Sequence, residues 1–298
     1  MSSFRQRASR GLRAAYHDHF HKRFKLWRVR LREEGYLRQL RTKQEAQIVV
    51  NYSRAQDSLL DSLCNQYGSD KGGNSRTEHP YPWKHHTYSD FLSLLFEPNR
   101  HQVKLVFECG IGTNNLGFPA NMGARGIPGA SLRVWRDYFP NSEVFGADID
   151  ESVLFEEERI KTLSLDQRNP NSVADMWRRI GRSGFDLMID DGLHVFEAGK
   201  TLFLGSIDHL APNGTYIIED VLHEDMLRYM DFFSHSDYRV DFVSLLRPRE
   251  RRYVPMRDNQ MIVIRHLQSA RPWLRKEASC ESTESSNPNP MTFLRSDD

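Results

Sequence analysis

The chain has few cysteines and no long apolar run, and each shortage excludes a class of protein. The three cysteines, Cys64, Cys109 and Cys280, are an odd number at distant positions, which fits neither a disulfide framework nor a zinc cluster. No apolar run approaches the ~20 residues of a membrane span, and no apolar signal segment opens the sequence. With 298 residues and 39% hydrophobic content, the sequence predicts one soluble core with solvated appendages and a cytoplasmic location.

Acidic residues are scarce near the amino terminus, although the whole chain carries a net charge of only +1. Residues 1–43 hold thirteen Lys or Arg against three Asp or Glu, a charge of +10 that leaves −9 for the rest. Aromatic and aliphatic residues lie among these bases, which predicts a basic, partly amphipathic helical arm. For this arm, peripheral contact with an anionic inner membrane, docking on the acidic domain of the same chain and assembly into a homo-oligomer are left as alternatives. We expect no nucleic-acid partner, because no recognition motif accompanies the charge.

Strand and helix patterns alternate through the middle of the sequence. Candidate strands cover 104–108, 143–148, 160–165, 185–190 and 214–219, and helical patterns lie near 57–65, 88–96, 131–138, 171–181, 195–210 and 223–234. The alternation predicts an α/β fold with a doubly wound, mostly parallel sheet covered on both faces. Two further strands, 238–246 and 260–266, predict a terminal antiparallel hairpin.

These patterns divide the chain into three parts. Residues 1–55 form the basic helical arm, and residues 56–270 form the α/β domain. Residues 271–298 are rich in Ser, Asn, Pro and acids, which predicts a disordered tail.

Two of the predicted strands end in adjacent acids. The strand that begins at residue 185 ends in Asp190-Asp191 and is followed by His194, and the strand that begins at residue 214 ends in Glu219-Asp220. Parallel strands that end side by side would bring these groups to one edge of the sheet, where open α/β folds bind ligands. A single Asp after a strand is also a common turn former or helix cap. Two such endings together with a histidine predict an active site.

A glycine-containing turn follows the first strand. Gly110 and Gly112 permit a tight turn and a close approach of the backbone to a ligand. Asp148 ends the next strand and could accept hydrogen bonds from both hydroxyls of a ribose. The third strand runs into Asp166 and Gln167, whose side chains suit an adenine edge. Together these positions predict a ligand that contains adenosine, although each residue taken singly fits a turn or cap equally well.

The turn lacks the third glycine of a dinucleotide-binding loop. Such a loop uses Gly-x-Gly-x-x-Gly at the start of a helix to receive a pyrophosphate, whereas here Gly112 is followed by Thr-Asn-Asn-Leu. Glu108 is placed to engage the ammonium of a methionine, and Asp190 is assigned to the same donor site. The sequence therefore favours S-adenosylmethionine over NAD. The segment 113–130, rich in Gly and Pro, is expected to be an insertion over the site.

Seven motifs follow one another between about residues 60 and 247. They are Tyr67-Gly-Ser-Asp-Lys71, Glu108-Cys-Gly-Ile-Gly112, Gly129-Ala-Ser-Leu-Arg-Val-Trp-Arg-Asp-Tyr-Phe-Pro140, Gly146-Ala-Asp-Ile149, Asp166-Gln167, Ile189-Asp-Asp-Gly-Leu-His194 and Ile218-Glu-Asp220. In this order they resemble the metal-dependent macrolide-sugar O-methyltransferases of the mycinamicin type and related bacterial glycan methyltransferases. The resemblance implies a class I methyltransferase fold with a seven-stranded Rossmann-like sheet, dependence on Mg²⁺ and a sugar hydroxyl as acceptor. The basic arm does not resemble the extra amino-terminal domain of the macrolide enzymes.

Carried over residue by residue, the resemblance implies roles for the residues at the ends of these two strands. Asp191 and Asp220 match metal ligands, Glu219 is a neighbour of the metal site, and His194 matches the catalytic base. Mg²⁺ suits hard carboxylates and would make a chelated hydroxyl more acidic, while a histidine nearby could take the proton. His209 and His223 are rival candidates for the base.

We therefore expect an O-methyltransferase that depends on S-adenosylmethionine and Mg²⁺ and acts on a sugar hydroxyl of a bacterial polysaccharide, glycolipid or glycosylated product. One alternative is methylation of a catechol-like small molecule, which would use similar chelation. Another is a non-catalytic protein that binds S-adenosylmethionine within a membrane glycan-assembly complex, where the basic arm would be the main functional element.

Overall fold

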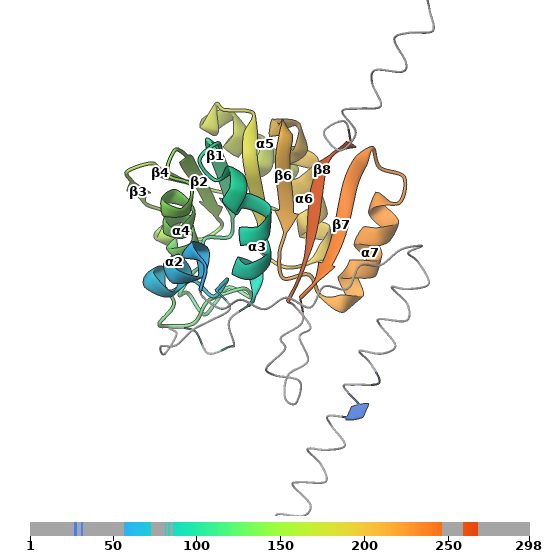
Figure 1. Cartoon of the computed structure of the whole chain (residues 1–298), viewed down its shortest axis with the longest axis horizontal. Helices are drawn as coiled ribbons and strands as arrows, with labels where there is room; N and C mark the ends of the chain where they lie inside the picture. The colour runs from blue at the N-terminus through green and yellow to red at the C-terminus, as the bar shows by residue number, and fades with distance from the viewer. Residues whose placement is uncertain are drawn as a thin grey trace, which may run out of the picture.

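The computed structural model describes residues 27, 28, 31, 57–72, 81, 83, 86–245 and 259–267. Its centre is an eight-stranded sheet in the order β3-β4-β2-β1-β5-β6-β8-β7 (Figure 1). The strands are β1 (Leu105–Cys109), β2 (Glu143–Asp148), β3 (Glu156–Glu157), β4 (Ile160–Ser164), β5 (Phe185–Asp190), β6 (Leu210–Ile218), β7 (Tyr238–Ser244) and β8 (Gln260–His266). Almost all of the predicted arm and the whole predicted tail lie outside the described residues, so the three domain limits stay predictions.

Strand pairing confirms the predicted sheet. β1 lies between β2 and β5, and these pairs, as well as β2 with β4 and β5 with β6, are parallel. β8 runs antiparallel between β6 and β7, so the last two strands form the predicted hairpin. The chain order reverses between β1 and β5, and such a switch point opens a crevice at the carboxyl ends of the strands.

Two details of the sheet differ from the prediction. The sheet has eight strands rather than seven, because the two-residue β3 pairs antiparallel with the edge strand β4, and a strand this short leaves no periodic pattern in the sequence. β6 begins at Leu210, not Gly214, so the preceding helix is shorter than predicted. The β5–β6 pairing is irregular at Phe185, and a Cβ on Gly214 would lie 2.5 Å from the Phe185 carbonyl oxygen. Only glycine therefore fits this close approach of the two backbones.

Helices cover both faces of the sheet (Figure 1). α2 (Leu59–Tyr67), α3 (Tyr88–Phe96) and α4 (Ala130–Tyr138) bury their apolar sides in one core cluster, and α5 (Pro170–Ile180), α6 (Phe196–Ser206) and α7 (His223–Phe233) in the other. Short 3₁₀ turns follow at η1 (Glu97–Asn99), η2 (Glu151–Val153) and η3 (Ile207–His209). None of the helices in the described part is long and apolar enough to cross a membrane.

Helix α5 shows how local sequence sets an element that supports the sheet. The Asn169 side chain caps its first turn by accepting from the Asn171 amide, Pro170 occupies the first turn, and Gly181 ends the helix in a left-handed conformation. The helix buries residues at i, i+3, i+4 and i+7, namely Val173, Met176, Trp177 and Ile180. This spacing makes one apolar stripe, which packs on the sheet.

Candidate active site

The two strands that are followed by acids, β5 and β6, end side by side, as the sequence predicts. The Asp191 amide donates to the Cys109 carbonyl at the end of β1, and the Glu219 amide donates to the Asp190 carbonyl at the end of β5, each over 2.9 Å. One side-chain ligand atom from each of Asp191, His194 and Asp220 lies within 4.8 Å of the others. The structure therefore brings the two predicted metal ligands and the predicted base together at the carboxyl edge of the sheet.

These groups open into a cavity of about 480 Å³. Most of the predicted site residues line it, namely Gly110, Gly112, Asp148, Asp166, Gln167, Asp191, His194 and Asp220. Residues 118–122 of the predicted insertion also line the cavity. Glu108, Asp190 and Glu219 are not among its lining residues, and each is almost fully buried.

Asp148 shapes the glycine turn. Its carboxylate accepts from the Ile111 amide over 3.0 Å and from the Asp150 amide over 2.9 Å. Burial raises the pKa of Asp148, and these backbone donors oppose that rise. The carboxylate thus fixes the turn while still reaching the cavity, which is compatible with its predicted contact with a ribose.

Gln167 and Asp190 hold the loop after β5. Gln167 accepts from the Leu193 amide over 2.7 Å and donates to the Asp190 carboxylate over 3.1 Å. Asp190 also accepts from the Gly192 amide. Asp166 instead pairs with Arg168 at the cavity edge, over 3.0 Å. The polar groups of Gln167 and Asp190 therefore support the loop, and the roles predicted for all three residues in donor binding stay predictions.

We expect Gly110→Ala to be more harmful than a comparable glycine substitution elsewhere. Gly110 has φ +84°, and an added Cβ would lie 2.1 Å from the Asp191 carbonyl oxygen. Gly184 is the matched control, because its φ is +82° and an added Cβ would meet nothing within 4 Å. In urea unfolding, Gly184→Ala should cost about 1 kcal/mol, the ordinary cost of a left-handed alanine. Gly110→Ala should cost at least ~2 kcal/mol; equal losses would contradict the predicted clash.

Two site residues other than glycine have left-handed backbones. His194 has φ 56° and Asp220 has φ 54°, a conformation that costs free energy and persists only where neighbours impose it. Tyr88 supplies one constraint, because its hydroxyl donates to Asp220 Oδ1 over 2.5 Å and accepts from the Asp220 amide over 3.2 Å. Such strained backbones are concentrated at functional sites.

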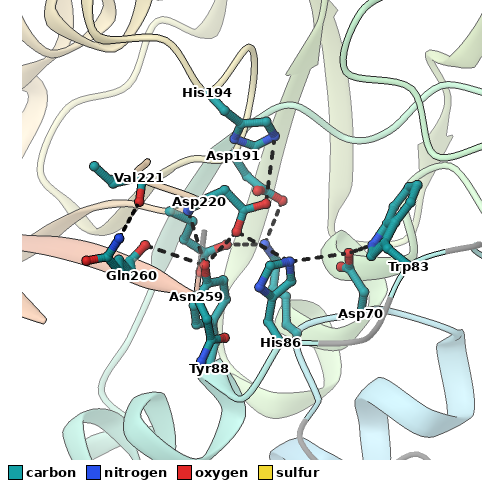
Figure 2. A network of polar contacts seen from close by, with 12 residues as sticks. Asp70, Trp83, His86, Tyr88, Asp191, His194, Asp220, Val221, Asn259 and Gln260 are labelled. Carbon is teal, nitrogen blue, oxygen red and sulfur yellow. Dashed lines mark hydrogen bonds and ion pairs between the residues drawn. The ribbon is translucent and has the colours of Figure 1, made fainter. Parts of the chain in front are cut away.

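Asp220 lies between two histidines (Figure 2). Its Oδ1 is 3.5 Å from His86 Nε2, and its Oδ2 is 3.9 Å from His194 Nε2. Burial acts to raise the pKa of Asp220, but the two histidines and the Tyr88 hydroxyl outweigh it, so the pKa is lowered. The carboxylate is therefore held in the anionic form that a metal ligand needs.

A buried lysine forms ion pairs with Asp191, Glu108 and Glu219. Lys71 is 2% exposed, and its Nζ lies 2.7 Å from Asp191 Oδ2 and 3.3 Å from Glu108 Oε1, and also donates to Glu219 Oε2. Burial alone would lower the pKa of Lys71, but the three carboxylates raise it well above its ordinary value. Burial raises the pKa of Asp191 to about 7, opposed by Lys71.

Sequence reasoning missed the side chains that reach the candidate site from outside the strand ends. Lys71 stands in the first of the seven motifs, but nothing local predicts that its ammonium reaches three strands. His86 falls in a stretch with several His and Pro residues, and Tyr88 starts a helix that has an ordinary core pattern. By contrast, the rival bases are excluded from the cavity: the His223 ring lies 2.7 Å from the Gln260 amide nitrogen, and the His209 ring stacks on Trp177.

The fold and the site together define a class. A mostly parallel sheet whose last strand is inserted antiparallel, with a glycine turn after β1 and an acid at the end of β2, is the class I methyltransferase fold. No family model matches the chain.

Comparison with known proteins confirms the resemblance to sugar O-methyltransferases. The chain is 34% identical over 162 residues to the 8-demethyl-8-alpha-L-rhamnosyl tetracenomycin-C 2'-O-methyltransferase of Streptomyces olivaceus, covering 54% of this chain and 37% of that protein. It is 32% identical over 136 residues to the mycinamicin VI 2''-O-methyltransferase of Micromonospora griseorubida, covering 46% of this chain and 32% of that protein. The match therefore spans about a third of each of these relatives.

A solved structure is also similar. The MycE methyltransferase from the mycinamycin biosynthetic pathway, in complex with Mg, SAH and mycinamycin VI, is 28% identical to this chain. The match covers 56% of this chain and 40% of that one, with a TM-score of 0.43.

Proposed function

We propose that the chain transfers a methyl group from S-adenosylmethionine to a sugar hydroxyl and requires Mg²⁺. The observation that carries the proposal is the meeting of Asp191, Asp220 and His194 in the cavity that the glycine turn and Asp148 also line. Two carboxylates are the hard oxygen donors that Mg²⁺ prefers. The rhamnosyl and mycinamicin substrates of the two relatives support a sugar hydroxyl as the acceptor rather than a catechol.

Each site residue has its own role in the proposed reaction. Asp191 and Asp220 would hold the metal, which supplies Lewis acidity toward the acceptor hydroxyl. His194 takes the proton of that hydroxyl at Nε2, the nitrogen that faces Asp220. Gly110 and Asp148 place the donor in the same cavity. The contribution of the chain is therefore mainly the alignment of oxygen, methyl carbon and sulfur.

The acceptor enters from the side formed by residues 68–71 and the two aromatic residues Tyr81 and Trp83. Trp83 lines the cavity, stacks with Tyr81 at 5.4 Å and donates from its indole to Asp70 over 2.8 Å. Figure 2 shows that Trp83 contacts Asp70, that Asp70 lies beside His86, and that His86 lies beside Asp220. An apolar ring face beside a carboxylate suits a sugar, which presents both C–H groups and hydroxyls.

Calorimetry and a transfer assay test the proposal. We expect S-adenosylmethionine to bind in the presence and absence of Mg²⁺, and methyl transfer to a panel of rhamnosides to require Mg²⁺. Catechol, offered in parallel, should not be methylated. Transfer that survives thorough chelation would overturn the metal requirement, and methylation of catechol alone would favour the small-molecule alternative. Donor binding without transfer to any acceptor would favour a non-catalytic binding protein.

The basic residues 1–43 are proposed to bring a cytoplasmic enzyme to an anionic membrane that carries a lipid-linked glycan such as a polysaccharide precursor. The support is their +10 charge, since each base near an anionic surface contributes about 1 kcal/mol. Deletion of residues 1–43 should abolish sedimentation with anionic vesicles and leave turnover of a soluble acceptor unchanged. A change of subunit count on deletion, with no vesicle binding by the intact chain, would instead assign the arm to a homo-oligomer interface.

A further inference from the structure

The segment between β1 and α4 folds back on itself beside the cavity, and its residues 113–129 are called the cavity loop below. Both arms of the loop are tied to the glycine turn. The Met122 amide donates to the Thr113 carbonyl over 2.9 Å, and the Gly129 amide donates to the Ile111 carbonyl over 2.7 Å. Compact loops whose ends lie close together and whose own groups hold them are frequently functional.

The start of the cavity loop is also tied to the end of β2. The Thr113 hydroxyl donates to the buried carboxylate of Asp150, and the Asp150 amide donates to Asp148 Oδ1 over 2.9 Å. Asp148 is one of the residues proposed to place the donor. A chain of hydrogen bonds therefore links the position of the cavity loop to the donor site.

The Met122 side chain lies between two glycine backbones. A Cβ added to Gly112 would lie 2.5 Å from Met122 Cε and 2.8 Å from its Sδ, and a Cβ added to Gly126 would lie 2.4 Å from Cγ and 2.6 Å from Sδ. Asn114 holds the second glycine at this place, because its side-chain amide donates to the Gly126 carbonyl over 2.9 Å. An unbranched, flexible thioether suits such a narrow gap. The two glycines therefore fix the course of the Met122 side chain.

One of these glycines lies in the candidate site and the other lies outside it. Gly112 and Met122 line the cavity, whereas Gly126 does not. Gly112 has φ +85°, so its backbone favours glycine in any case, but the φ of Gly126 is not positive. At position 126 the reason for glycine is the space that Met122 takes. A side chain there would act on the cavity through Met122.

We propose that Met122 is a further donor-binding residue, which the cavity loop holds against the glycine turn so that its thioether contacts bound S-adenosylmethionine, and that Gly126 sets its position from outside the cavity. This contact adds a residue to the donor site of the proposed function and rests on that function. The apolar, polarizable surface of Met122 suits the methylene groups and the ribose of the donor. Gly126 is a positioning residue, because it acts through Met122.

A double-mutant cycle on donor affinity tests both parts of the proposal. Met122→Gly should weaken the binding of S-adenosylmethionine to the full chain, measured by calorimetry, at least ~5-fold, because an apolar contact is lost. Gly126→Ala should weaken it by a similar factor, because the added Cβ displaces Met122. In the Met122→Gly background, Gly126→Ala should have no further effect, since the three atoms nearest the added Cβ all belong to the Met122 side chain.

Gly117→Ala is the matched control in the same loop. Gly117 is exposed and does not line the cavity, and the atom nearest an added Cβ is Asn115 Oδ1 at 3.2 Å. This variant should bind the donor as the wild type does. In steady-state assays, Gly126→Ala should raise the KM for the donor and keep most of kcat, while Gly117→Ala should change neither.

The melting temperature, measured without donor, separates a role in the site from a role in packing alone. A lower melting temperature of Gly126→Ala with an unchanged donor Kd overturns the proposal, and so do losses of affinity that simply add in the double variant. If Gly126→Ala does not fold, a double variant that folds and binds like Met122→Gly supports the proposal, and one that does not fold overturns it. A wild type that binds no S-adenosylmethionine overturns the proposed function and this inference together. A wild type that binds it no better than Met122→Gly does overturns this inference alone.

Discussion

Asp220→Asn should lower methyl transfer by at least ~10²-fold and leave the affinity for S-adenosylmethionine largely unchanged. The amide keeps the shape of the side chain but loses the negative charge, and a bound metal supplies several kcal/mol of transition-state stabilisation. Asparagine is the suitable replacement because Asp220 has φ 54° and asparagine tolerates the left-handed region better than most residues. Donor affinity should persist, since Gly110 and Asp148 are the residues proposed to place the donor. Calorimetry for the donor and a radiolabel transfer assay measure the two quantities.

Substitution of Asp220 tests the metal site more specifically than substitution of Asp191 does. Asp191 accepts a hydrogen bond from Lys71, so its substitution would also disturb the contacts of Lys71 with Glu108 and Glu219. The matched control is Asp175→Asn, because Asp175 is half exposed on α5 and pairs only with Arg178 among the residues that the structure describes. Full transfer by Asp220→Asn, or retained transfer by the wild type in excess EDTA, would remove Asp220 from the metal site.

His194→Asn should reduce transfer by at least ~10²-fold near neutral pH, the usual contribution of a general base. Asparagine again accepts the left-handed backbone, since His194 has φ 56°. The variant should fold normally, because the His194 side chain is about a quarter exposed and no core cluster includes it. Binding of donor and of Mn²⁺ should be retained. Steady-state kinetics with the donor saturated would show the loss in kcat rather than in the KM for the donor.

His223 provides the comparison for this loss. The sequence leaves it as a rival for the base, but its ring lies against Gln260 and does not line the cavity. His223→Gln should therefore keep most of the transfer activity. A merely twofold loss for His194→Asn together with a large loss for His223→Gln would move the base to His223.

The sequence by itself determined the elements and the edge at which the site forms. The bounds predicted for β2, β5 and β8 agree with the structure, because continuous apolar runs bounded by turn residues mark buried strands. The positions of Asp191, His194 and Asp220 just after two strands were enough to predict that they lie together, since neighbouring parallel strands all end at one edge. The motif order indicated the class, and the similarity to known sugar O-methyltransferases confirms it.

Only the tertiary structure decided which charges meet. The sequence predicts a donor contact for Glu108 and a metal-site role for Glu219, and both roles stay predictions. What the structure adds is that both are buried partners of Lys71, which lies 37 and 148 residues away. His86 and Tyr88 likewise reach Asp220 from a segment more than 130 residues earlier. Local patterns record burial and periodicity, whereas a contact between distant charges depends on how helices α2 and α3 pack against the sheet. That packing is a property of the whole chain, so no single stretch of sequence predicts that a buried lysine meets three carboxylates.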